Sequence, residues 1–143
     1  MKRIDLHIHT IPAPNGKDAG FTFDIANFQH FTSELQLDAI AITNHNLFNQ
    51  EQFQTINDAL TDTVVFPGIE IDYEDGHLLL ISENQELDDF AAKCASIEHE
   101  YDAEGKISTA KLLEIFGDLG NYLLIPHHDK KPAVSDTALQ PLK

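Results

Sequence analysis

Short apolar runs that suit buried strands alternate with segments of helical periodicity along most of this chain. The strand-like runs cover residues 2–8, 38–43, 63–73, 77–82 and 121–128. Apolar residues at spacings of three and four indicate helices at 24–36, 49–60, 86–101 and 109–119. This order, β-α-β-α-β-β-α-α-β, predicts an α/β fold with mostly parallel strands. In such folds the functional residues lie at the carboxyl ends of the strands.

Two local signals refine these boundaries. Asn49 and Gln52 form the capping-box pattern that opens a helix. Pro67 and Gly68 predict a break within the strand at 63–73. The tail that follows the last strand shows no clear period.

Length and charge restrict the class of protein. The 143 residues, of which 42% are hydrophobic, suit one domain over 1–143 with a single core. Nine Lys and Arg against 24 Asp and Glu give a net charge of −15, which opposes unaided binding to nucleic acid or an anionic membrane. A single cysteine, Cys94, excludes an internal disulfide, and the N-terminus lacks the apolar core of a signal peptide. We therefore expect a cytoplasmic protein that does not contact membranes.

Candidate metal ligands cluster at the ends of the strand-like runs. They are His7 and His9, Asn44 and His45, Glu70, His77, and His127 and His128. Alternation along a strand puts His7 and His9 on the same side, where two imidazoles can bind one ion. One histidine at a strand end is usually an ordinary polar residue, but six of the eight lie there. The exceptions, His30 and His99, fall within helices and are expected to be structural or exposed. The sequence therefore predicts a metal site, with imidazole suited to zinc, iron or manganese.

Other carboxylates have simpler expected roles. Asp5 is placed to hydrogen-bond a ligand histidine, or to anchor its own strand; we favour the first role. We expect Asp72, Glu74 and Asp75 to lie in a solvated turn.

The motifs DLHIHT, AITNHN, PGIEID, GHLLLI and IPHH, in this order, resemble the PHP (polymerase and histidinol phosphatase) domain family. The resemblance covers nearly the whole chain. It implies a distorted (β/α)7 barrel that holds two or three divalent metal ions (zinc, manganese or iron) at the carboxyl ends of its strands and hydrolyses phosphoester bonds. TNHN together with PGIEI looks closest to PHP domains at the N-terminus of SMC-like or AAA-like ATPases.

The resemblance also implies how the ligands divide among ions. They are His7, His9 and a bridging Glu70 for the first, His45 for the second, and Glu70, His77 and His127 or His128 for the third. Adjacent strand residues face opposite ways, so only one of the last pair is expected to bind, and we favour His127 because it directly follows the IP dipeptide.

The expected reaction is attack of a metal-activated water on a phosphomonoester or phosphodiester. Glu70, His45 and Lys130 are the candidate catalytic residues, and Lys130 and Lys131 the candidate phosphate-binding residues. The expected substrate is a small phosphorylated molecule or the end of a nucleic acid. Surface lysines are at least as often merely solvated.

Two departures from the family pattern bear on activity. Asn44 stands where the family has an aspartate, so the second ion should be held weakly or not at all. No Asp-x-His motif follows His128, and a complete barrel usually needs about 250 residues. We therefore expect a partial barrel of five or six strands. Its open edge should be covered by the tail, a second copy of the chain or a C-terminal region absent from this sequence.

Two other functions remain open at this point. The first is a catalytically degenerate PHP module that binds metal within a larger assembly. The second is a TatD-type or amidohydrolase-like hydrolase, since these barrels also open with HxH. Against the amidohydrolase, no lysine is placed at a strand end to bridge two metals.

Overall fold

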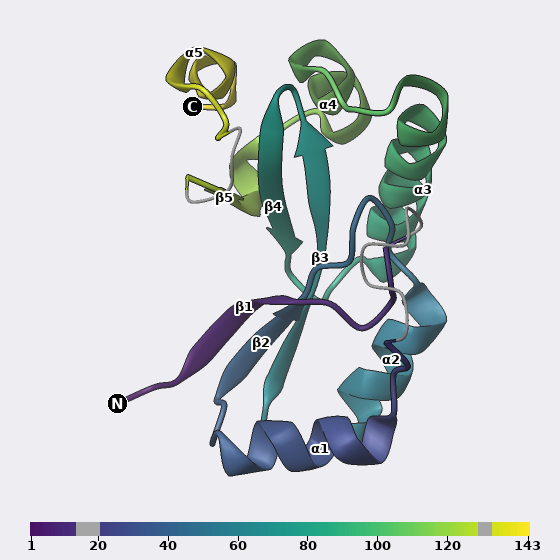
Figure 1. The fold of residues 1–143 in the computed structure, drawn as a ribbon, viewed down its shortest axis with the longest axis vertical. Helices are drawn as coiled ribbons and strands as arrows, with labels where there is room; N and C mark the ends of the chain where they lie inside the picture. The colour runs from purple at the N-terminus through teal and green to yellow at the C-terminus, as the bar shows by residue number, and fades with distance from the viewer. Residues whose placement is uncertain (14–20, 129–132) are drawn as a thin grey trace.

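The computed structural model describes residues 1–13, 21–128 and 133–143, and within them five strands form one curled sheet, like half of a barrel (Figure 1). The strands are β1 (Ile4–Ile8), β2 (Ala39–Ile42), β3 (Val64–Tyr73), β4 (Gly76–Ser82) and β5 (Tyr122–Pro126). Their order in the sheet is β1-β2-β3-β4-β5. The predicted order of elements along the chain is confirmed, and the five strands fit a partial barrel.

Four of the five strands run in the same direction. β1, β2 and β3 are parallel neighbours, whereas β4 is antiparallel to both β3 and β5. Because β4 runs backwards, its first residues lie beside the last residues of β3. The carboxyl ends of four strands and the start of β4 therefore meet at one rim of the sheet.

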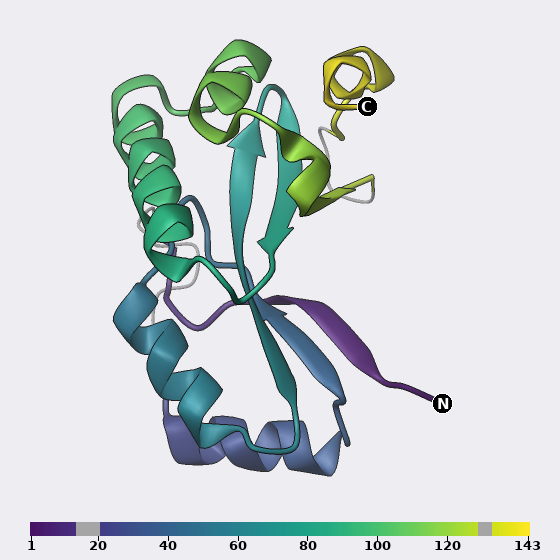
Figure 2. The same ribbon diagram turned by 180° about the vertical axis from the view of Figure 1, so that it is seen from behind.

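The helices cover the outer face of the sheet in two groups (Figure 2). They are α1 (Ile25–Glu34), α2 (Gln50–Ala59), α3 (Leu87–Glu104) and α4 (Thr109–Phe116), with short helical turns η1 (Leu119–Asn121), α5 (Asp136–Leu139) and η2 (Gln140–Leu142). Phe53 and Ile56 of α2 pack on β2, and Phe90 and Ile97 of α3 pack on β3 and β4. Among the described residues, no helix is both long and apolar enough to cross a bilayer.

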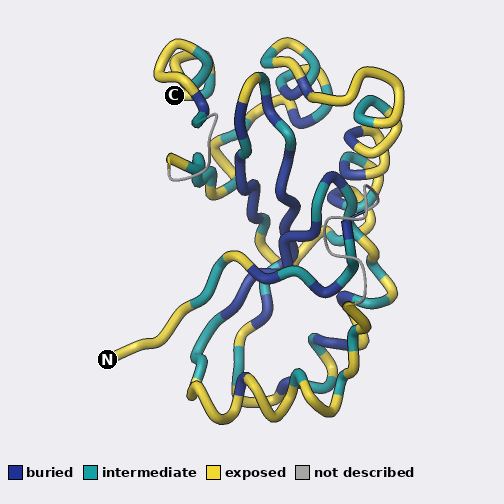
Figure 3. Tube along the Cα trace, viewed as in Figure 1, coloured by how far each residue is buried: buried dark blue, intermediate teal, exposed yellow. Residues whose placement is uncertain are grey.

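The core consequently has two parts. One cluster of buried side chains lies under α1 and α2 and the other under α3 and α4. Buried segments gather in the last residues of β2 and along β3 and β4 (Figure 3). β3 contributes to both clusters, through Val65 in one and Ile69, Ile71 and Tyr73 in the other, so it joins the two halves of the molecule.

The predicted break at Pro67 and Gly68 is wrong, because β3 continues through them. Instead this is where β3 changes its main partner: Pro67 is the last residue in register with β2, and Gly68 the first in register with β4. Gly68 is needed for close packing, since a Cβ there would lie 2.8 Å from Cγ2 of Thr43. The sequence signal thus marked a change of neighbour rather than an end.

The tail is more ordered than its sequence indicated. The hydroxyl of Tyr73 donates a hydrogen bond to the carbonyl oxygen of Ala138 in α5 at 2.6 Å. Val134 is buried against Gly76, where a Cβ would lie 2.6 Å from the Val134 nitrogen. The tail therefore docks on the tip of the β3–β4 hairpin through one hydrogen bond and close backbone packing.

Candidate metal centre

The candidate site is built around Glu70, a fully buried carboxylate in β3. β3 residues alternate between its two faces, so Glu70 lies opposite the core residues Ile69 and Ile71 and points to the inner side of the curl. Burying a carboxylate is costly unless charged or polar groups compensate it. Its two oxygens face two different sets of histidines, which supply such groups.

Three histidines surround the oxygen Oε2. The Nε2 atoms of His7 and His9 lie 3.0 Å and 2.7 Å from it, and Nδ1 of His45 lies 3.3 Å away. His7 is in β1 and His9 follows it, and their Nε2 atoms are 3.1 Å apart, as expected for side chains on one side of a strand. His45 follows β2 and pairs with Glu70 as an isolated parallel bridge.

The other oxygen, Oε1, faces two further histidines. Nδ1 of His77 lies 3.8 Å from it and Nδ1 of His127 lies 3.7 Å from it. The backbone N–H of His127 donates to the carbonyl oxygen of His77 at 3.0 Å, which holds the end of β5 beside the start of β4. His128 is exposed, so the structure favours His127 over His128 as the residue at this side of Glu70.

The donor set fits divalent metal ions. His7, Glu70 and His127 form one group whose ligand atoms lie within 4.8 Å of one another, and His9, His45 and Glu70 form another. Imidazole nitrogens with a shared carboxylate are common ligands of zinc, iron and manganese. Five of the six ligands predicted from the sequence belong to these groups, and the sixth, His77, lies 3.8 Å from Oε1 of Glu70. His45 lies with His9 rather than apart from it. How the ligands divide among ions stays a prediction.

Asn44 holds the chain around the site instead of facing it. Its Oδ1 accepts hydrogen bonds from the backbone N–H groups of Thr10 at 2.7 Å and Ile11 at 2.9 Å. Its Nδ2 donates to the hydroxyl of Thr10 at 3.1 Å. Both acceptor positions of the amide oxygen are thus occupied, and Asn44 is not available as the oxygen ligand that its position in the motif offered.

The hydroxyl of Thr10 also explains an incomplete capping box. Asn49 caps α2 as predicted, since its side chain accepts from the N–H of Gln52 at 2.8 Å. The Gln52 side chain does not return this bond; its Oε1 accepts from the Thr10 hydroxyl at 2.6 Å. A bond between distant segments has replaced the local one, and it fixes the backbone that follows His9.

Two carboxylates differ from expectation. Asp5 accepts a hydrogen bond from the backbone N–H of His7 at 3.1 Å, so it anchors the strand and does not orient an imidazole. Asp72 does not lie in a solvated turn: its Oδ1 is buried 2.9 Å from Nδ1 of His77. A sequence signal existed, because Asp72 and His77 are spaced for pairing across a two-residue hairpin turn.

Glu74 and Asp75 occupy that turn, as predicted, but Glu74 also has a structural role. Its Oε1 accepts hydrogen bonds from the backbone N–H and the hydroxyl of Thr109 at 2.6 Å and 2.8 Å. These bonds hold the pKa of Glu74 below its ordinary value. Asp75 is exposed.

The remaining predicted residues lie away from the cluster or cannot be placed. His30 and His99 are exposed on helices, as expected. Lys130 and Lys131, the candidate phosphate-binding residues, lie outside the described residues, so their roles stay predictions.

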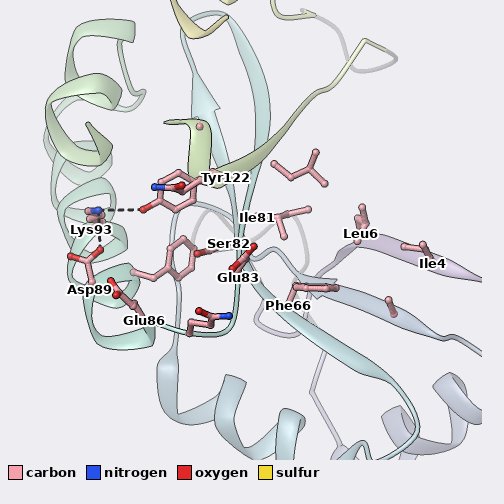
Figure 4. A pocket seen from close by; sticks show the side chains of 16 residues that line it. Ile4, Leu6, Phe66, Ile81, Ser82, Glu83, Glu86, Asp89, Lys93 and Tyr122 are labelled. Atoms are coloured by element: carbon pink, nitrogen blue, oxygen red, sulfur yellow. Dashed lines mark hydrogen bonds and ion pairs between the residues drawn. The ribbon is translucent and has the colours of Figure 1, made fainter. Parts of the chain in front are cut away.

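A hollow in the described structure is lined by none of the candidate ligand residues and lies between the sheet and the start of α3 (Figure 4). It has a volume of about 760 Å³ and is lined on one side by apolar residues of the sheet: Ile4, Leu6, Phe66, Ile81 and Leu123. Ile4 in β1 and Leu123 in β5, the two edge strands, are largely exposed. The expectation that the tail, a second copy of the chain or a further C-terminal region covers the open edge of the sheet stays a prediction. Sedimentation over a range of concentrations would test for the second copy.

Neither a scan against models of known protein families nor a search among curated proteins found a match for this chain.

Proposed function

We propose that this chain is a PHP-type metal-dependent phosphoesterase that hydrolyses phosphomonoesters or phosphodiesters. The observation that carries the proposal is the arrangement at Glu70: one fully buried carboxylate whose two oxygens face different sets of histidines. A carboxylate placed in this way suits two adjacent divalent ions, and two-metal sites are typical of phosphoester hydrolysis. A glutamate at the centre of the site also favours this function over the amidohydrolase type, in which a lysine bridges the metals.

The chain's own residues would hold and position the ions. His7, His9 and His45 would bind metal on the side of one oxygen of Glu70. His77 and His127 would bind metal on the side of the other oxygen. When bound, zinc, manganese or iron ions would lower the pKa of a bound water and stabilise charge that develops on a phosphoryl group. Glu70 fixes the spacing of the two sets, and Asn44 and Thr10 keep the backbone after His9 in place.

Charge supports a small substrate. The net charge of −15 repels polyanions, and bound cations would offset it only near the rim of the sheet. We therefore propose a small phosphorylated molecule or the end of a nucleic acid as substrate, and a cytoplasmic location.

Hydrolysis of p-nitrophenyl phosphate and bis-p-nitrophenyl phosphate, with zinc, manganese or iron supplied in turn, tests this proposal. Glu70→Gln should lower turnover by more than the roughly 10–100-fold loss typical of residues that merely support a ligand. Glu98→Gln makes the same chemical change on the exposed surface of α3 and should leave turnover unchanged. Equal turnover in the Glu70 and Glu98 variants would contradict the proposal.

Metal content tests the site independently of activity. Replacing His7 and His9 together by alanine should remove bound metal, as measured by mass spectrometry of the dialysed protein. The matched replacement of His30 and His99, both exposed on helices, should not. Equal loss of metal from both double variants would overturn the assignment of the site.

A second function, a catalytically silent metal-binding module, is favoured by one observation. Asn44 stands where the resemblance implies a charged ligand. Its side-chain oxygen instead accepts hydrogen bonds from backbone N–H groups. Wild-type protein that retains metal but hydrolyses neither substrate would support the module and exclude the phosphoesterase.

A further inference from the structure

Asp72 and His77 form a directly opposed pair on the β3–β4 hairpin. Opposed residues of an antiparallel pair point to the same face of the sheet. Asp72 also lies two residues after Glu70 on the same strand, and therefore on the same face. The hairpin thus brings a second carboxylate to the rim where the histidines meet.

The facing atoms of this pair lack hydrogen-bond partners. Oδ1 of Asp72 and Nδ1 of His77 are 2.9 Å apart, but their geometry is not that of a hydrogen bond, and both atoms are buried without a hydrogen-bond partner. A buried polar atom left in this state destabilises the folded protein. A native structure rarely keeps two such atoms side by side unless an ion, a water or a functional role accounts for them.

The separation of the two atoms is suited to a shared cation. Two ligand atoms that each lie about 2.1 Å from one ion are roughly 3–3.4 Å apart at octahedral or tetrahedral angles. His77 Nδ1 is also 3.8 Å from Oε1 of Glu70, so it stands between two carboxylates. A proton on Nδ1 of His77 cannot hydrogen-bond both carboxylates at these distances.

Asp72 is held firmly by groups outside the cluster. Its backbone N–H donates to Oδ1 of Asn46 at 2.8 Å, and its carbonyl oxygen accepts from the N–H of Ile107 at 2.7 Å. Burial of Tyr101 in α3, followed by the charge of Asp72, raises the pKa of this phenol.

We propose that Asp72 is a further ligand of the metal centre and binds, together with His77, an ion on the Oε1 side of Glu70. The proposal rests on the metal centre of the proposed function, but not on its phosphoesterase activity. Asp72 provides a negative charge that Asn44 does not. Two carboxylates at one ion shift its preference from zinc toward harder ions such as Mn²⁺.

Binding of Mn²⁺ to the full chain, measured by titration calorimetry, tests the proposal. Asp72→Asn keeps the size of the side chain and should weaken Mn²⁺ binding at least 10-fold, and Zn²⁺ binding less. Asp75→Asn makes the same change in the same hairpin, on a side chain that is 83% exposed, and should leave both unchanged.

Thermal unfolding separates a ligand from a structural residue. In the presence of a chelator, Asp72→Asn should unfold at the wild-type temperature or above it, because the negative charge of a carboxylate with a buried oxygen has been removed. With Mn²⁺ added, it should gain less stability than the wild type. A structural role for Asp72 would instead lower the unfolding temperature in the chelator, and that result would overturn the proposal.

The other outcomes are equally decisive. Wild-type affinity for Mn²⁺ in Asp72→Asn would overturn the proposal and leave the remaining metal centre intact. Wild-type protein that binds no metal would overturn both. Binding that depends on Asp72, in a protein without phosphoesterase turnover, would support this proposal and contradict the proposed function.

Discussion

Replacing Asn44 by alanine should destabilise the protein in the absence of any metal. The change removes the acceptor for two backbone N–H groups, those of Thr10 and Ile11, and the donor to the Thr10 hydroxyl. Thr10 is buried, so its N–H would lose its partner where water does not readily replace it. Asn44 thus holds in place the backbone segment that directly follows His9.

The size of the effect follows from these bonds. An orphaned buried N–H costs about 1–3 kcal/mol and a partly exposed hydrogen bond about 1 kcal/mol, so we expect a total loss of about 2–4 kcal/mol. The hydroxyl of Thr10 adds little, because it keeps its bond to Gln52. For a chain of this length the loss corresponds to a fall in unfolding temperature of roughly 6–16 °C.

The assay is urea unfolding followed by circular dichroism, in a chelator so that bound metal does not add to the stability. Asn44→Asp keeps the acceptor oxygen and should lose less than Asn44→Ala. Asn27→Ala, on the exposed surface of α1, should stay within about 0.5 kcal/mol of the wild type. The reasoning is refuted if Asn44→Ala is as stable as the wild type, or if the aspartate variant loses as much as the alanine variant.

Two further predictions concern the β3–β4 hairpin. Because its pKa is lower in the folded than in the unfolded protein, Glu74 should contribute stability above its ordinary pKa, near 4.5, and lose it as the pH falls through the folded value. Glu74→Gln should therefore be less stable than the wild type at pH 7 and approach it in acid, as measured by urea unfolding from pH 7 to 3; a constant difference would contradict this. Gly76→Ala should push the tail off the hairpin, since the new Cβ meets the backbone of Val134, and should cost about 1–3 kcal/mol. Limited proteolysis should then cut the tail faster than in the wild type, and an unchanged rate would show that the packing relaxes elsewhere.

Local patterns predicted the elements well because they depend on neighbouring residues. The apolar period gave the four main helices, and Asn49 marked the start of α2. Where a local signal was misread, a distant segment had supplied the competing interaction. Pro67 and Gly68 mark the change from β2 to β4 as partner, and Gln52 bonds Thr10 instead of completing its own cap.

The sequence by itself determined which residues could form the site. His77, at the start of β4, reaches the rim because β4 is antiparallel to β3. A histidine or a glutamate stands at or near the carboxyl end of each other strand, and the order of strands and helices sends these ends to one rim. This follows from the direction of parallel strands and needs no knowledge of contacts.

Only the tertiary structure decided how those residues are used. The register of β3 with β4 set Asp72 against His77, and the positions of β1 and β5 on either side gave each oxygen of Glu70 its own histidines. Asn44 supports the backbone because its side chain accepts a hydrogen bond from the N–H of Thr10, which is 34 residues away in the sequence. These roles depend on the pairing of segments that are far apart in the chain. The spacing of apolar residues within one segment carries no information about such pairing.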